Sequence, residues 1–136
     1  MNTIETERLM LVKKELDLLK KNLKASDLSE YNQKRLLNEL KTAIVMKEDD
    51  LPEDAVCIDS QVEIKEVNGG QRFNFQIVLP AEANMQNKRI SVFAPIAIAL
   101  LGYRVGSKVQ WEMPNGMKTF EILKVKHKEA KSLIGG

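Results

Sequence analysis

The chain has 136 residues, of which 43% are hydrophobic and 29% are charged, and its formal net charge is +2. This composition fits one ordinary globular domain with an appendage, and a charge of +2 is too small to indicate a nucleic-acid binder, which needs a concentrated basic face. No run approaches the roughly 18 apolar residues of a membrane span, the first residues lack the pattern of a signal peptide, and the lone Cys57 has no disulfide partner. We therefore expect a cytoplasmic protein without membrane contact or specific nucleic-acid readout, in which Cys57 is a small buried side chain.

Residues 1–46 are predicted to form an antiparallel helical hairpin, a short coiled coil. The apolar residues of the first helix follow the 3-4-3-4 spacing of a coiled-coil seam; they are Leu9, Val12, Leu16, Leu19 and Leu23. The pattern breaks at Ser26 and Asp27, and a second helix is expected whose apolar face holds Leu36, Leu37, Leu40 and Ile44. At about 20 residues each and ~1.5 Å per residue, these helices would be ~30 Å long.

Residues 47–55 are acidic and contain a proline, so they are predicted to be a linker without regular structure. In the remaining domain, residues 56–136, apolar and polar residues alternate, and Asn68-Gly69-Gly70 and Asn115-Gly116 are typical of tight turns between strands. The alternation changes phase after Ile122, which indicates a β-bulge. The pattern predicts an α+β fold, with an antiparallel sheet of about five strands and one short helix.

The short helix is predicted over residues 95–101. Pro95 suits the first turn of a helix because its φ angle is fixed and it has no N–H group, and Gly102 can adopt the left-handed conformation that ends a helix. Residues 95–101 are almost wholly apolar. This helix must therefore lie against a sheet or a partner.

The order of these features between Arg89 and Val125 resembles the C-terminal domain of the Gre transcript-cleavage factors, the GreA/GreB family, and of their shorter relative Rnk. The shortness of the predicted hairpin makes the resemblance closest to Rnk-like members. It implies an FKBP-like topology for the sheet, and RNA polymerase as partner at the rim of its secondary channel, bound by a monomer without a cofactor. An FKBP-like topology is also found in prolyl isomerases, so this activity is a further hypothesis. Such a site needs a pocket walled by aromatic residues, whereas most aromatic residues of this chain are expected to pack on the faces of strands.

One candidate site is the corner between a strand and the short helix, where Gre factors dock on the polymerase rim. It consists of Phe93, Ala94, Pro95 and Ile96. Gre factors have Asp-Ser-Pro at this corner, so only the proline matches. A large apolar Phe93 beside an exposed corner suits a binding patch; the alternative is a corner that only packs the helix.

The other candidate is the pair Asp27 and Glu30, which matches the D-x-x-E pair at the hairpin tip of Gre factors. In that family the two carboxylates help to hold a catalytic metal and water for RNA cleavage, and carboxylate oxygens are natural ligands of Mg²⁺. Alternatively, Asp27 is the N-cap of the second helix and Glu30 its N3 residue. A ~30 Å hairpin would leave these carboxylates short of the polymerase active centre. We therefore favour capping and expect no metal site.

The sequence thus predicts a non-enzymatic regulator that binds RNA polymerase at the secondary channel and competes with longer coiled-coil factors. Two alternatives stay open at this point. One is a transcript-cleavage elongation factor that acts through the tip carboxylates. The other is a module that binds a protein other than polymerase.

Overall fold

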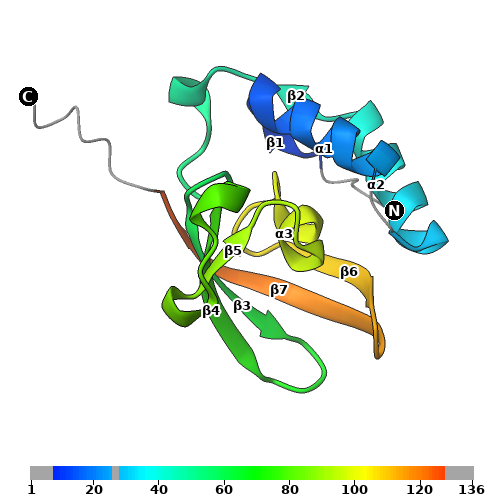
Figure 1. Ribbon diagram of the computed structural model, residues 1–136. Coiled ribbons are helices and arrows are strands. Elements are labelled where there is room, and N and C mark those ends of the chain that lie inside the picture. Colours follow the sequence, from blue (N-terminus) through cyan, green and yellow to red (C-terminus); the bar gives the residue numbers. More distant parts are fainter. Residues whose placement is uncertain (1–7, 26–27, 128–136) are drawn as a thin grey trace, which may run out of the picture.

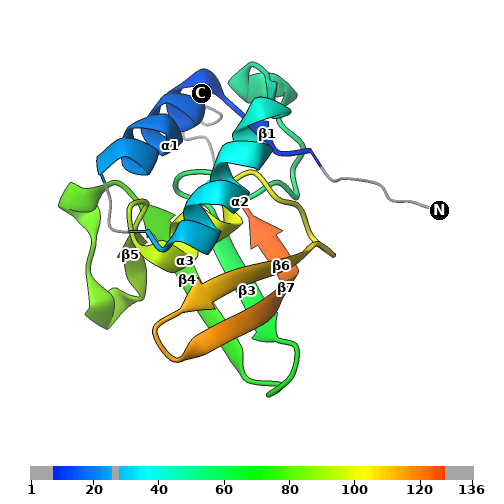
Figure 2. The ribbon, with the colours of Figure 1, turned by 90° about the vertical axis from the view of Figure 1, so that its right-hand side faces the viewer.

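The computed structural model describes residues 8–25 and 28–127, including only the backbone of Asn22, Lys24 and Ala25. Within these residues the fold is mixed α+β, as expected, with three α-helices on one side of a curled sheet (Figure 1, Figure 2). The helices are α1 (Lys13–Ala25), α2 (Glu30–Lys41) and α3 (Pro95–Leu100), and none is long and apolar enough to cross a membrane. The strands are β1 (Met10–Leu11), β2 (Ile44–Val45), β3 (Gln61–Glu66), β4 (Arg72–Val78), β5 (Arg89–Ser91), β6 (Lys108–Met113) and β7 (Gly116–Lys126).

The main sheet has five strands in the order β5-β4-β3-β7-β6. Neighbouring strands are antiparallel except β4 and β5, which are parallel, so the prediction of an antiparallel sheet was wrong for β5. Two 3-10 turns, Pro80–Glu82 and Met85–Asn87, carry the chain back along β4 before β5 begins. Alternation of apolar residues reveals the faces of a strand, but it does not reveal the direction of its neighbour.

The turns and the bulge lie close to their predicted positions. Gly70 has a φ angle of 74°, and its N–H group donates to the carbonyl of Glu66 between β3 and β4. In the hairpin of β6 and β7 the two loop residues are 114 and 115, one residue earlier than expected, because Met113 pairs with Gly116. The bulge is confirmed: the register between β3 and β7 shifts so that Leu123 is the extra residue.

The helix α3 packs on the apolar inner face of the sheet. That face carries large side chains that are at most 5% exposed, namely Val62, Ile64, Val109, Trp111, Phe120 and Ile122. The last four residues of α3 are buried as well. Burying one large apolar side chain contributes roughly 1.5–3 kcal/mol. The start of α3 is therefore held on a well-packed support.

The helices α1 and α2, called the helical pair below, lie side by side (Figure 1, Figure 2). They have 13 and 12 residues, so the predicted length was wrong. Leu9 and Val12 precede α1, because the chain is extended at β1, which pairs in parallel with β2. The N–H group of Met10 donates to the carbonyl of Gly102, beyond α3, at 3.0 Å. This contact fixes the base of the helical pair beside the sheet.

Residues 47–55 contain regular structure, contrary to the prediction. A 3-10 turn spans Glu48–Asp50, and Ala55 forms an isolated β-bridge with Arg104, whose guanidinium binds Asp54 at 2.8 Å. The buried leucines of the N-terminal part belong to the same hydrophobic cluster as the sheet residues; they are Leu9, Leu11, Leu19 and Leu36. The division into domains at residues 1–46, 47–55 and 56–136 stays a prediction.

Candidate functional site

The corner at residues 93–96 is an exposed apolar edge on a fixed turn. Ser91 forms the turn: its hydroxyl accepts the N–H group of Phe93 at 3.0 Å, and its carbonyl accepts that of Ala94 at 2.9 Å. Ala94 is the N-cap of α3 and Pro95 its first residue, as predicted. Phe93 is 41% exposed and Pro95 is exposed, whereas Ala94 and Ile96 are half-buried. The four residues thus present two apolar side chains together.

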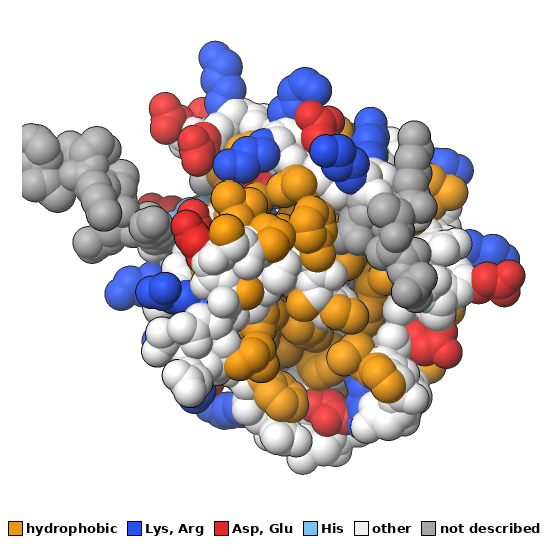
Figure 3. All heavy atoms as spheres, viewed as in Figure 1, with side chains coloured by type: hydrophobic (Ala, Val, Ile, Leu, Met, Phe, Trp, Pro, Cys, Tyr) orange, Lys and Arg blue, Asp and Glu red, His pale blue; other side chains and the backbone are white. Residues whose placement is uncertain are grey.

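A backbone hydrogen bond also fixes the end of α3. Gly102 has a φ angle of 90°, and its N–H group donates to the carbonyl of Val56 at 2.9 Å. Around α3 and the strands beside it, apolar side chains gather in the middle of one face of the molecule (Figure 3). A group of apolar side chains that is exposed together on one face is typical of an interaction site.

The start of α2 is capped by Ser29 and not by Asp27. The hydroxyl of Ser29 accepts the N–H group of Asn32 at 3.2 Å, and Glu30 is the exposed first residue of the helix, not its N3 residue. The predicted capping pair was therefore wrong, because the helix begins two residues later than expected. Asp27 itself lies outside the described residues. Within residues 8–25 and 28–127, no group of three or more His, Cys, Asp or Glu side chains is placed to hold a metal ion.

Replacing Ser29 with alanine should lower the free energy of unfolding by about 1 kcal/mol, because the N–H group of Asn32 loses its acceptor. Chemical denaturation followed by circular dichroism measures this change. Ser29→Asp supplies another acceptor and should unfold within a few tenths of a kcal/mol of the parent. Equal losses in both variants would show that Ser29 does not act as the cap.

Three polar contacts that the sequence did not predict join α2 to β6 and to the segment after α3. In one of them the hydroxyl of Tyr31 donates to Oε1 of Gln110 in β6 at 3.4 Å. The side-chain amide of Asn32 exchanges two hydrogen bonds with the backbone of Glu112 in β6. Further along α2, Arg35 and Glu39 both contact the hydroxyl of the buried Tyr103. The only local signal was the position of Asn32 on the apolar face of the helix, four residues before Leu36. A polar residue there needs a buried partner.

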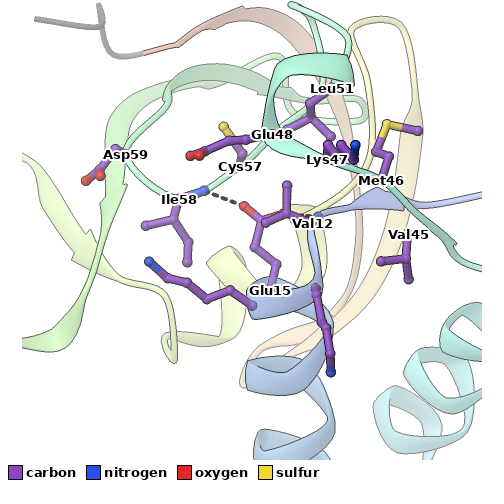
Figure 4. A pocket seen from close by; sticks show the side chains of 12 residues that line it. Val12, Glu15, Val45, Met46, Lys47, Glu48, Leu51, Cys57, Ile58 and Asp59 are labelled. Atoms are coloured by element: carbon purple, nitrogen blue, oxygen red, sulfur yellow. Dashed lines mark hydrogen bonds between the residues drawn. The ribbon is translucent and has the colours of Figure 1, made fainter. Parts of the chain in front are cut away.

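A cavity of about 610 Å³ lies where α1, residues 45–51 and residues 57–59 meet (Figure 4). In its wall the carboxylate of Glu15, only 2% exposed, accepts the N–H groups of Val12 at 3.2 Å and Ile58 at 2.9 Å. Burial raises the pKa of Glu15, and these two hydrogen bonds oppose the rise. Glu15 therefore joins the start of α1 to the segment that leads into β3.

Cys57 also lines this cavity and is half-buried, not fully buried as expected. Burial raises the pKa of its thiol to about 12. Its half-buried position in the cavity wall and this raised pKa both favour a packing role for Cys57.

Comparison with known sequences gives one consistent result. The family model described as "Transcription elongation factor, GreA/GreB, C-term" matches residues 51–127. The chain is 36% identical over 92 residues to the transcription elongation factor GreA of Clostridium botulinum, covering 68% of this chain and 58% of that protein. It is 34% identical over 90 residues to the regulator of nucleoside diphosphate kinase of Escherichia coli, covering 65% of this chain and 66% of that protein. The chain spans less than two thirds of the length of these relatives.

Two solved structures have a similar fold. A prokaryotic transcription elongation factor GreA/GreB from Nitrosomonas europaea superimposes with a TM-score of 0.66 at 24% identity, covering 90% of this chain and all of that one. Gfh1 of Thermus aquaticus superimposes with a TM-score of 0.51 at 24% identity, with the same coverage. At such identities the likeness concerns the fold alone.

Proposed function

The chain belongs to the GreA/GreB family of transcription elongation factors, and from this premise we propose that it is a non-enzymatic transcription regulator that binds RNA polymerase in the cytoplasm as a monomer. It docks on the rim of the secondary channel through the corner at residues 93–96. In this proposal the helical pair is a short coiled-coil hairpin beside an FKBP-like domain. It occupies the mouth of the channel and thereby excludes longer coiled-coil factors. The exposed apolar corner inside the matched segment is the observation that carries this proposal.

The corner has the physical features of a binding hot spot. Phe93 offers a large apolar surface that is 41% exposed, and Pro95 beside it adds apolar surface with a fixed backbone. Buried α3 and the Ser91 turn hold both residues in place before binding. Little conformational entropy is then lost on association, and aromatic anchors on rigid supports dominate many interfaces.

Replacing either Phe93 or Pro95 with asparagine should weaken binding to core RNA polymerase by about 30-fold, which corresponds to the roughly 2 kcal/mol of a hot-spot residue. The measurement is the dissociation constant of the labelled protein for purified core enzyme. Circular dichroism and thermal unfolding should show that both variants remain folded, since neither side chain is buried.

Met117→Asn is the matched control, because Met117 is 42% exposed and belongs to the β6–β7 hairpin, not to the corner. It should bind polymerase like the parent. If all three variants bind equally, the docking assignment is wrong. If the parent itself does not bind polymerase, the proposed function is wrong and the alternative of a module for another protein is favoured.

The helical pair favours a blocking role over a cleavage role. Its helices have 13 and 12 residues, which gives ~20 Å and ~18 Å at ~1.5 Å per residue. The first turn of α2 is bonded to β6 through Asn32, so the start of α2 lies beside the sheet domain. A carboxylate at the start of α2, such as that of Glu30, would then stay close to the proposed rim contact, which supports a regulator without cleavage activity of its own.

A further inference from the structure

The contact between Asn32 and β6 replaces a missing strand neighbour. β6 is an edge of the five-stranded sheet, so the outward N–H and C=O groups of Glu112 have no partner within the sheet. The amide of Asn32 accepts that N–H group at 2.9 Å and donates to that carbonyl at 2.9 Å. Asn32 is only 4% exposed. Two parallel hydrogen bonds fix both the position of α2 and its rotation about its own axis.

A second contact holds α2 one to two turns further along. The guanidinium of Arg35 donates to the hydroxyl of Tyr103 at 3.2 Å, and this hydroxyl donates to the carboxylate of Glu39. Arg35 and Glu39 also form an ion pair at 3.3 Å, with both side chains less than a quarter exposed. Tyr103 belongs to the segment after α3, so this contact links the helical pair to the element that carries the corner.

The base of the helical pair is held independently. Glu15 binds the N–H group of Ile58, and Leu11 is fully buried against Gly102. The helical pair is thus fixed at its base and along α2. An arm that swings freely on a linker would not need buried polar contacts along its length, because each must be broken for the arm to move.

We infer that Asn32 and Tyr103 are positioning residues, which set the orientation of the helical pair relative to the corner at residues 93–96. The fixed orientation is a property of the isolated chain. Its consequence rests on the proposed function: docking through the corner places the helical pair over the channel mouth only while these contacts hold. Loss of the contacts should then leave docking intact and weaken exclusion of other factors.

Distances between spin labels in the isolated protein test the orientation. Cys57 is the only cysteine of the chain, so Cys57→Ser gives a background in which Lys34→Cys on α2 and Asn74→Cys on β4, both at exposed positions, carry the labels. In this background Asn32→Ala and Tyr103→Phe are combined. Alanine favours the helix over asparagine, so α2 itself should remain formed, which circular dichroism checks. We expect one narrow distance distribution in the parent and a broadened or shifted one in the double variant.

Asn38→Ala, which changes an exposed asparagine of α2, serves as the matched control. Its distribution should match that of the parent. An unchanged narrow distribution in the Asn32→Ala, Tyr103→Phe protein would overturn the inference, because other contacts would then suffice to orient the helical pair.

A binding assay then tests the consequence. The double variant should bind core polymerase like the parent, but about tenfold more of it should be needed to exclude a longer coiled-coil factor, because the four hydrogen bonds of Asn32 and Tyr103 no longer orient the helical pair. Equal exclusion by a variant whose distances have broadened would contradict the consequence. Failure of the parent to bind polymerase would refute the proposed function alone, since the distance measurement does not involve polymerase.

Discussion

Replacing Gly102 with alanine should lower the free energy of unfolding by about 3 kcal/mol, from backbone strain and overpacking together. The φ angle of Gly102 is 90°, which an L-residue adopts only at a cost. An added Cβ atom would also lie 2.8 Å from Leu11 Cδ2 and 3.1 Å from Leu9 Cβ. Both leucines are at most 1% exposed, so they have no free space in which to move.

Gly106→Ala is the matched control for this prediction. Gly106 has a φ angle of 93°, yet a Cβ atom there would meet nothing within 4 Å. It should therefore show the strain alone, about 1 to 2 kcal/mol. Equal losses at the two glycines would mean that the close approach of β1 to Gly102 contributes nothing.

A double-mutant cycle locates the effect more closely. Leu11→Ala should cost less in the Gly102→Ala protein than in the parent, because the truncated side chain makes room for the new Cβ atom. Guanidinium denaturation of the four proteins gives the coupling free energy. This test bears on function, since β1 is the segment that ties the base of the helical pair to the end of α3.

Features set by a single residue type were predictable from the sequence. Pro95 and Gly102 bound α3 because one residue fixes a helical φ angle and the other adopts a positive one. The bulge at Leu123 followed from the change of apolar phase. These signals act within a few residues, so they need no knowledge of the neighbouring elements.

Features decided by distant partners were not predictable. Leu9 and Val12 fit a helical seam, but Leu9 and Leu11 also fit the alternation of a strand, and the carbonyl of Gly102 that accepts the N–H group of Met10 decides between them. Likewise, the parallel direction of β5 is set by the path of residues 79–88. The partners of Asn32 lie 80 residues away along the chain. No periodicity within a helix reports such a partner.

The exposure of the corner was predictable, whereas the first residue of α2 was not, for a related reason. The exposure of Phe93 and Pro95 follows from a strand that must turn into an apolar helix, and both residues are local to that turn. The role of Asp27 and Glu30 depended on the first residue of α2, which the sequence placed too early. Helix boundaries are the least certain part of a sequence-based prediction, and a capping assignment depends wholly on them.

The protein should abolish the cleavage activity of a longer Gre factor without supplying any cleavage of its own. A helical pair of ~20 Å is too short to project far beyond the proposed rim contact, and the bond between Asn32 and β6 keeps the start of α2 beside the sheet domain. The protein would share the docking site of the longer factor, but it would supply no carboxylates to the polymerase active centre. The block should follow the occupancy of one site and become complete at saturation.

Titration into a cleavage reaction of stalled polymerase, stimulated by a GreA protein, measures this block. Phe93→Asn should shift the titration to about 30-fold higher concentration, in step with its weaker binding, while Met117→Asn should leave it unchanged. Cleavage that rises instead, and that is lost in an Asp27→Ala, Glu30→Ala protein, would establish a cleavage factor acting through the tip carboxylates. Cleavage that stays constant while the protein is demonstrably bound to polymerase would rule out a shared site, and the regulator would then act elsewhere on the enzyme.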